Sequence, residues 1–214
     1  MTKRFVLVAG NIGSGKTSLT ERLGERLGWI TAFESVQDNP YLADFYQDMH
    51  AWAFHLQVFF LGHRARQHLA LARAAESAIV DRSIYEDAEI FARTSLDLGN
   101  IAPRDYQAYR SVYELVIGSL PAPDLLLHLR APIPVLLRRI RDRARAIEAG
   151  VTETYLSLLE QKYEQWLANF DLCPVLTLRT DDLDFVHQPR HLEIVIDRMQ
   201  AKFAGREEVQ FPPP

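Results

Sequence analysis

One segment near the start of the chain constrains its fold more than any other. A short apolar run, residues 4–9, leads directly into a glycine-rich octapeptide, GNIGSGKT, after which helical periodicity begins at once. The octapeptide matches the pattern G-x-x-x-x-G-K-[S/T], whose glycines let the backbone curl so that successive N–H groups point at phosphate oxygens. Strand, loop and helix follow in the order that such a loop requires, so the segment predicts an α/β protein that binds the phosphates of a nucleotide. The predicted phosphate-binding residues are Gly10, Asn11, Ile12, Gly13, Ser14, Gly15, Lys16 and Thr17.

The rest of the chain repeats this alternation of strand and helix. Five short apolar runs predict strands at residues 4–9, 29–34, 78–81, 124–129 and 175–179. Because most of them are continuously apolar, they indicate a parallel sheet that is buried on both faces. Segments of helical periodicity lie at residues 16–27, 40–75, 86–98, 103–120, 133–146, 152–169 and 189–203. Crossovers of this length predict a three-layer α/β fold in one domain over residues 1–214, with a loose tail at about 205–214.

Composition narrows the function classes. The 214 residues are 48% hydrophobic and carry a formal net charge of −4, which gives no reason to expect nucleic acid or an acidic membrane as a partner. No apolar stretch reaches the roughly 18 residues of a membrane helix, and the first apolar run is too short for a signal peptide. The single cysteine, Cys173, cannot form an intrachain disulfide. We therefore expect a cytoplasmic protein in which Cys173 is a small buried apolar residue.

Two carboxylates end predicted strands, where the ligands of an open α/β sheet bind. Glu34 ends the second strand, Asp81 ends the third, and Arg82 follows directly. One carboxylate can take the proton of an acceptor hydroxyl and another can hold Mg²⁺ together with Thr17, while an arginine steadies the transferred phosphoryl group beside Lys16. Each residue alone could equally be a helix cap or a turn residue. Their combination with the phosphate loop favours a small-molecule kinase over a motor or a GTPase switch.

A dense basic segment at residues 138–145 is followed by Glu148 and a glycine. A solvated helix face would explain it, and an RNA- or DNA-binding patch is disfavoured because no aromatic residue alternates with the arginines. Arg139 and Arg143 are four residues apart and share a helix face, so we expect a mobile lid at about 138–150 that clamps phosphates from above.

The aromatic-rich stretch at residues 41–60 is mostly core at helical spacing, but one polar residue does not fit that interpretation. Gln57 lies within the apolar surface, and Arg64 follows two turns later on the same face. A buried glutamine needs hydrogen-bond partners, which the edge of a nucleobase would supply. Asp87 could pair with Arg64, either as a structural ion pair or as part of a base-reading group.

Taken together, these segments resemble the deoxyribonucleoside kinases, enzymes that phosphorylate the 5′-hydroxyl of deoxynucleosides with Mg²⁺ and ATP. The resemblance rests on the phosphate loop, on Glu34-Ser35-Val36, on the run from Phe54 to Gln57, on DRSIYED at 81–87, and on the arginine-rich lid. Residues 39–46 are similar to the bacterial branch, whose members are called deoxyadenosine or deoxyguanosine kinases.

The resemblance implies a role for each matched residue. Glu34 would meet the 5′-hydroxyl, Asp81 would serve Mg²⁺ or accept the proton, and Arg82 would contact Glu34 and the phosphoryl group. The lid would consist of Arg139, Arg143 and Arg145, and residues 180–185 would cradle the adenine of ATP. The remaining implied contacts are with the nucleoside: Tyr46 and Glu148 to the 3′-hydroxyl, Gln57, Arg64 and Asp87 to the base, and Phe91 stacked on it.

Three departures from the family pattern bear on local geometry and substrate size: Ser35, Phe60 and Ile147. An Arg64–Asp87 pair suits a base with an amino group beside a ring nitrogen, so adenine, guanine and cytosine stay open while thymine is disfavoured. We expect a homodimeric purine deoxynucleoside kinase; the dimer is implied by the resemblance alone. The alternatives are a deoxycytidine-preferring kinase, a nucleoside monophosphate kinase and a non-catalytic relative.

Overall fold

The computed structural model describes residues 2–33, 39–145, 148, 150–181, 183 and 188–204. Its centre is a single sheet of five parallel strands in the order β2-β3-β1-β4-β5. The strands are β1 (Phe5–Gly10), β2 (Ile30–Ala32), β3 (Ala78–Asp81), β4 (Leu125–Arg130) and β5 (Val175–Arg179). The predicted parallel sheet is confirmed, with four strands at or within one residue of the expected bounds and β2 shorter than expected.

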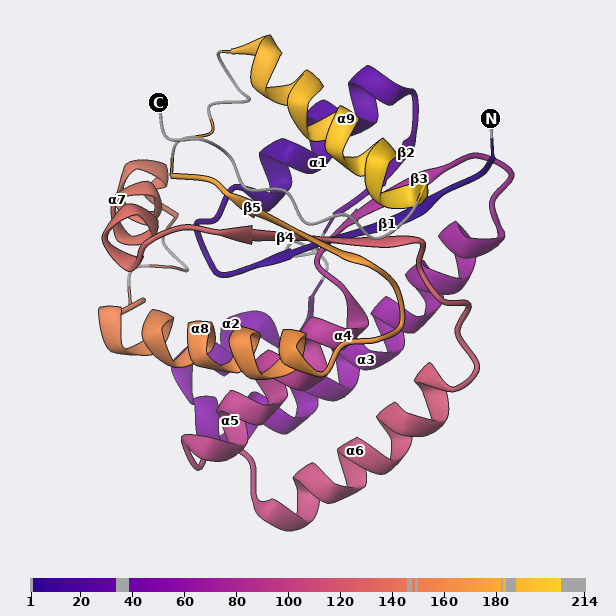
Figure 1. The fold of residues 1–214 in the computed structure, drawn as a ribbon. Coiled ribbons are helices and arrows are strands. Elements are labelled where there is room, and N and C mark those ends of the chain that lie inside the picture. Colours follow the sequence, from indigo (N-terminus) through magenta and orange to yellow (C-terminus); the bar gives the residue numbers. More distant parts are fainter. Residues whose placement is uncertain are drawn as a thin grey trace.

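Helices connect these strands and cover both faces of the sheet (Figure 1). The helices of the first half are α1 (Lys16–Leu27), α2 (Leu42–Gln47), α3 (Met49–Arg73), α4 (Ile84–Glu86), the π-helix η1 (Asp87–Ala92) and α5 (Arg93–Asp97). Those of the second half are α6 (Pro103–Ile117), α7 (Ile133–Arg143), α8 (Glu153–Ala168) and α9 (Pro189–Ala204). None of the described helices is long and apolar enough to cross a membrane.

Alternate residues of the strands face two separate cores. Val6 and Val8 of β1 pack with leucines of α1 and α9, whereas Leu7 and Ala9 pack with the layer formed by α3, the α4–η1–α5 segment, α6 and α8. Figure 1 shows α1 and α9 above the sheet and the larger helical layer below it. This arrangement follows from the two-residue period of a strand, which sends successive side chains to opposite faces. It confirms the predicted three-layer architecture.

Two helices predicted from the sequence periodicity are built differently in the structure. The segment predicted as one helix at 40–75 is two helices, because Asp48 is extended (φ −145°) and its carboxylate accepts from the N–H of Ala51 to begin α3. The segment predicted at 86–98 begins at Ile84 and contains the π-helix η1, which periodicity alone cannot reveal.

Two predicted helices, 103–120 and 133–146, end three residues early. Helix α7 ends at Arg143, and the capping residue Ala144 that follows has a left-handed φ of 49°. Several predicted features lie outside the described residues, namely Glu34, Ser35, Ile147, the tail at 205–214 and half of the expected adenine loop (residues 182, 184 and 185). Cys173 is a free, half-buried cysteine that packs against the core between the sheet and the larger helical layer. Burial raises the pKa of its thiol to about 12.

Candidate active site

The phosphate loop joins the end of β1 to α1 in the conformation that its glycines permit. Gly10, Gly13 and Gly15 all have positive φ, at 148°, 81° and 98°. A Cβ at Gly10 would lie 2.4 Å from the carbonyl oxygen of Leu129, and one at Gly13 would lie 2.9 Å from that of Leu136. Since backbone atoms cannot move away cheaply, these positions require glycine for space as well as for conformation.

The reactive side chains of the loop lie where the sequence predicts them. The Nζ of Lys16 donates to the carbonyl oxygens of Gly10 and Asn11, at 2.7 and 2.9 Å, so the ammonium lies inside the curl of the loop. Thr17 at the start of α1 donates its hydroxyl to Oδ2 of Asp81 at the end of β3, over 2.6 Å. The structure therefore brings two hard oxygen donors together at the carboxyl edge of the sheet. This is the donor type that Mg²⁺ prefers, in a site that substrate phosphates would complete.

Arg82 follows β3 in a conformation that is rare for a side chain of its size. Its φ is 70°, and its backbone N–H donates to the carbonyl of Val8 at 3.0 Å. The guanidinium lies 4.3 Å from the centre of the Phe91 ring, which fits a cation–π contact. A left-handed non-glycine residue costs about 1–3 kcal/mol and is typical of functional sites.

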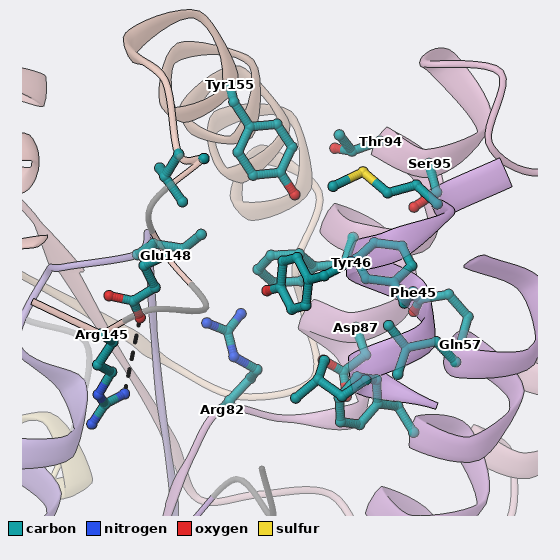
Figure 2. Close-up of a pocket in the computed structure, with 18 of the residues that line it drawn as sticks. Phe45, Tyr46, Gln57, Arg82, Asp87, Thr94, Ser95, Arg145, Glu148 and Tyr155 are labelled. Atoms are coloured by element: carbon teal, nitrogen blue, oxygen red, sulfur yellow. Dashed lines mark ion pairs between the residues drawn. The ribbon is translucent and has the colours of Figure 1, made fainter. Parts of the chain in front are cut away.

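A cavity of about 780 Å³ opens beside these residues. Its phosphate end is formed by Lys16, Thr17, Asp81 and Arg82, and its walls come from α2, α3, η1, α5 and the start of α8. In Figure 2, Arg82 lies between Glu148 and Arg145 on one side and Asp87 and Gln57 on the other. The described residues that line the rest of the cavity include Phe33, Phe45, Tyr46, Phe60, Phe91, Thr94, Ser95 and Tyr155.

The end of the cavity away from the phosphate loop carries polar groups in an apolar wall. Gln57 is 3% exposed, and its Oε1 has no hydrogen-bond partner among the described residues. Asp87 lines the cavity, and the predicted pair with Arg64 is present, with Nε 3.1 Å from Oδ2. Arg64 also reaches the carbonyl of Asp81 at 3.4 Å and is not among the described lining residues. It therefore holds Asp87 from the protein side.

The lid arginines divide between two surroundings. Arg143 donates to both oxygens of Glu148, at 3.0 and 2.6 Å, and Arg145 lies 3.9 Å from the same carboxylate. All three residues line the cavity. Arg139 instead binds the hydroxyl of Thr180 at 3.1 Å and also its carbonyl oxygen. Burial, with a smaller effect from Arg138, lowers the pKa of Arg139.

Two residues that support the phosphate loop, Glu86 and Tyr163, received no role from the sequence, and Thr180 was placed only within the expected adenine loop. Glu86 is fully buried and accepts from the N–H of Gly10 at 3.2 Å and from the hydroxyl of Tyr163 at 2.7 Å. Thr180 donates its hydroxyl to the carbonyl of Ser14 at 3.1 Å. The spacing of Ser83 and Glu86 matches a capping box and could have drawn attention to the glutamate, but no sequence signal marks Tyr163.

The fold, the loop and the cavity define a P-loop kinase, and comparison with known proteins identifies its family. The deoxynucleoside kinase family model matches residues 6–204. A deoxyadenosine/deoxycytidine kinase of Bacillus subtilis is 38% identical over 197 residues, 91% of each chain. A deoxyguanosine kinase of Lactobacillus johnsonii is 34% identical over 206 residues, 92% of this chain and 91% of that protein. The chain therefore belongs to the deoxynucleoside kinase family, and it is an ATP-dependent phosphotransferase.

A solved structure extends the similarity to three dimensions. Deoxyadenosine kinase from M. mycoides, with the products dCMP and a flexible dCDP bound, matches with a TM-score of 0.80 at 28% identity. The match covers 92% of this chain and 99% of that one. The predicted family and fold are thus confirmed.

Proposed function

We propose that this enzyme transfers the γ-phosphoryl group of Mg-ATP to the 5′-hydroxyl of a purine deoxynucleoside. The observation that carries the proposal is Gln57, a buried amide on the cavity wall whose oxygen lacks a partner within the described residues. A buried amide without a partner is costly, so its surroundings favour a ligand that completes its hydrogen bonds. A nucleobase offers both donors and acceptors along one edge.

The charges around Gln57 favour a base with an amino group. Asp87 beside it is an acceptor, held by Arg64, and suits the amino group of adenine, guanine or cytosine better than a carbonyl oxygen. A second phosphate at this end of the cavity would face the carboxylate of Asp87, which disfavours a nucleoside monophosphate as the acceptor. Both bacterial relatives are named for a purine deoxynucleoside, which supports a purine substrate, although the Bacillus enzyme is also named for deoxycytidine.

The phosphate end supports a division of labour between the two carboxylates. Asp81 contacts Thr17, so this pair would hold Mg²⁺, which when bound neutralises charge on the phosphates. We propose that Glu34, the other carboxylate predicted from the sequence, is the general base that accepts the proton of the 5′-hydroxyl. Lys16, Arg82, Arg143 and Arg145 would then stabilise the transferred phosphoryl group. Tyr46 and Glu148, on facing walls of the cavity, would hold the 3′-hydroxyl.

The assignment of Glu34 and Asp81 predicts different kinetics for two matched variants. Glu34→Gln should keep ATP binding and lower kcat by about a hundredfold or more, because a general base contributes roughly that much. Asp81→Asn should instead raise the Mg²⁺ concentration needed for half-maximal rate. Activity measured across a Mg²⁺ titration separates the two roles, and full activity of Glu34→Gln would reject its role.

The base-reading group gives a second prediction. Arg64→Ala removes the partner that holds Asp87, so we expect the preference among bases to weaken while the sugar is still bound. Relative kcat/KM values for deoxyadenosine, deoxyguanosine and deoxycytidine measure this preference. An unchanged preference in a folded variant would assign the pair to structure alone.

The proposal as a whole is tested by a panel of acceptors with Mg-ATP. The panel contains the four deoxynucleosides, their ribonucleoside counterparts and the deoxynucleoside monophosphates, with 5′-phosphate formation as the readout. We expect deoxyadenosine or deoxyguanosine to give the highest kcat/KM. Turnover of monophosphates alone would favour a nucleoside monophosphate kinase, and a preference for deoxycytidine would overturn the purine assignment.

We further propose that the enzyme acts in the cytoplasm as a homodimer. The free cysteine supports a reducing compartment. On the lower helical layer, Val112 and Leu115 of α6 are 53% and 78% exposed, which supports burial against a second copy. Sedimentation of the purified protein would test the dimer.

A further inference from the structure

Glu86 is a buried carboxylate that the phosphoryl-transfer roles above leave unused. It is the third residue of α4 and closes a capping box, in which its Oε2 accepts from the N–H of Ser83 at 3.1 Å. A capping box needs only one acceptor oxygen of the glutamate. Here the residue has no exposed area, and its second oxygen makes contacts outside its own helix.

That second oxygen, Oε1, meets three different elements. It accepts from the backbone N–H of Gly10, the first residue of the phosphate loop, at 3.2 Å. It also accepts from the hydroxyl of Tyr163 on α8 at 2.7 Å and lies 4.0 Å from Nη1 of Arg82. Burying a carboxylate is costly without such partners, and a neutral side chain would satisfy the helix cap equally well. The contacts that favour a charged group here, the N–H of Gly10 and the guanidinium of Arg82 at 4.0 Å, both lie outside the helix that Glu86 caps.

The three neighbours of this oxygen are themselves held by other parts of the protein. Gly10 lies against the backbone of Leu129, so closely that a Cβ at this position would be 2.4 Å from the carbonyl oxygen of Leu129. Arg82 has a left-handed backbone, and its guanidinium lies against the ring of Phe91 in the cavity wall. Tyr163 is buried as well, and burial, followed by the charge of Glu86, raises its pKa well above the usual value. Its hydroxyl therefore stays a donor at every physiological pH.

We infer that Glu86 is a positioning residue for phosphoryl transfer, which fixes the guanidinium of Arg82 relative to the first residue of the phosphate loop. One carboxylate then connects the side of the site that binds ATP with the arginine that faces the acceptor. This inference rests on the proposed role of Arg82 at the transferred phosphoryl group. A small displacement between these groups is enough to slow a reaction whose catalysis is mostly positioning and electrostatic stabilisation.

The first test is Glu86→Gln, which keeps the size and one acceptor oxygen but removes the charge. We expect kcat to fall at least tenfold, while KM for ATP and for the deoxynucleoside stays within threefold of the wild type. Glu89→Gln is the matched control, because Glu89 lies in the adjoining π-helix and pairs with Arg110 at 2.5 Å, away from the cavity. It should change the melting temperature and leave kcat unaltered. A kcat of Glu86→Gln equal to that of Glu89→Gln would overturn the inference.

The second test asks whether Glu86 acts through Arg82. Arg82→Lys should lower kcat strongly in the wild-type background and have much less additional effect in Glu86→Gln, because the two changes remove the same arrangement. Independent, multiplying effects would overturn the inference. If Glu86→Gln does not fold, Tyr163→Phe replaces it; kcat must then fall at unchanged KM, and an unchanged kcat rejects the inference. The wild-type acceptor panel is measured alongside, so failure of the proposed substrate class is seen separately.

Discussion

At the scale of single residues, the sequence predicts the location of a site residue where a local motif leaves only one role for it. The glycines of the phosphate loop, Lys16 and Asp81 could be placed from sequence, because the motif and the end of a strand fix both identity and location. Glu86 could not be placed, since its function depends on meeting Gly10 and Tyr163, which are distant in the chain. Local patterns carry no information on such contacts.

Two glycine positions allow the steric effect of an added Cβ to be separated from the cost of a positive φ. Gly13→Ala places a methyl group 2.9 Å from a carbonyl oxygen, whereas Gly28→Ala, also at positive φ, meets nothing within 4 Å. We expect Gly28→Ala to cost about 1–2 kcal/mol of stability, the price of a left-handed alanine, with normal kinetics. Gly13→Ala should cost more and raise KM for ATP at least tenfold. Urea unfolding and initial rates check both variants, and equal KM values would refute the steric argument.

At the scale of elements, the positions of strands and helices were predictable and their irregularities were not. Apolar runs located all five strands, and most accurately β1, β3 and β4 inside the sheet, because strands buried on both faces are uniformly apolar. The edge strands β2 and β5 are only partly buried. The π-helix η1 escaped prediction because its residues have ordinary helix propensities. The same segment places Asp87 and Phe91 on the cavity wall, so the least predictable element is also part of the candidate site.

The break between α2 and α3 leads to a test of its cap. Asp48 accepts from the N–H of Ala51 at 3.0 Å on an exposed surface. Asp48→Ala should therefore lower the free energy of unfolding by about 1 kcal/mol, whereas Asp48→Asn, which keeps the capping oxygen, should have little effect. Urea denaturation measures both variants. Equal losses would show that the charge, and not the hydrogen bond, starts α3.

At the scale of the whole molecule, stability should depend on pH through a buried histidine. Burial, followed by the charges of Arg130 and Lys16, lowers the pKa of His128 from 6.5 to about 4. Between these two pH values the unfolded chain binds a proton that the folded protein does not, so stability falls as the pH drops from 6.5 toward 4. The pKa difference corresponds to a loss of at most about 3 kcal/mol.

His128→Phe should reduce this acid sensitivity. The ring stacks on Tyr163 at 5.7 Å, and its Nε2 has no partner among the described residues. Phenylalanine removes only the 3.5 Å contact between Nδ1 and the hydroxyl of Thr177, which is an exposed residue. Part of the dependence of the unfolding free energy on pH should remain in this variant, because burial also lowers the pKa of His68. Unfolding free energies at pH 7 and pH 5 test this, and identical slopes in both proteins would contradict it.

The sheet order also dictates a sequence of events during synthesis. Strand β1 is made first, yet it lies at the centre of the sheet, between β3 and β4. The backbone N–H of Phe5 is bound by Asp124, 119 residues further along the chain. Closing such long loops is slow, so the central strand must wait for most of the polypeptide to leave the ribosome before it acquires both neighbours. Chains shortened before β4 would then carry an intact glycine-rich motif and still be unable to hold a nucleotide.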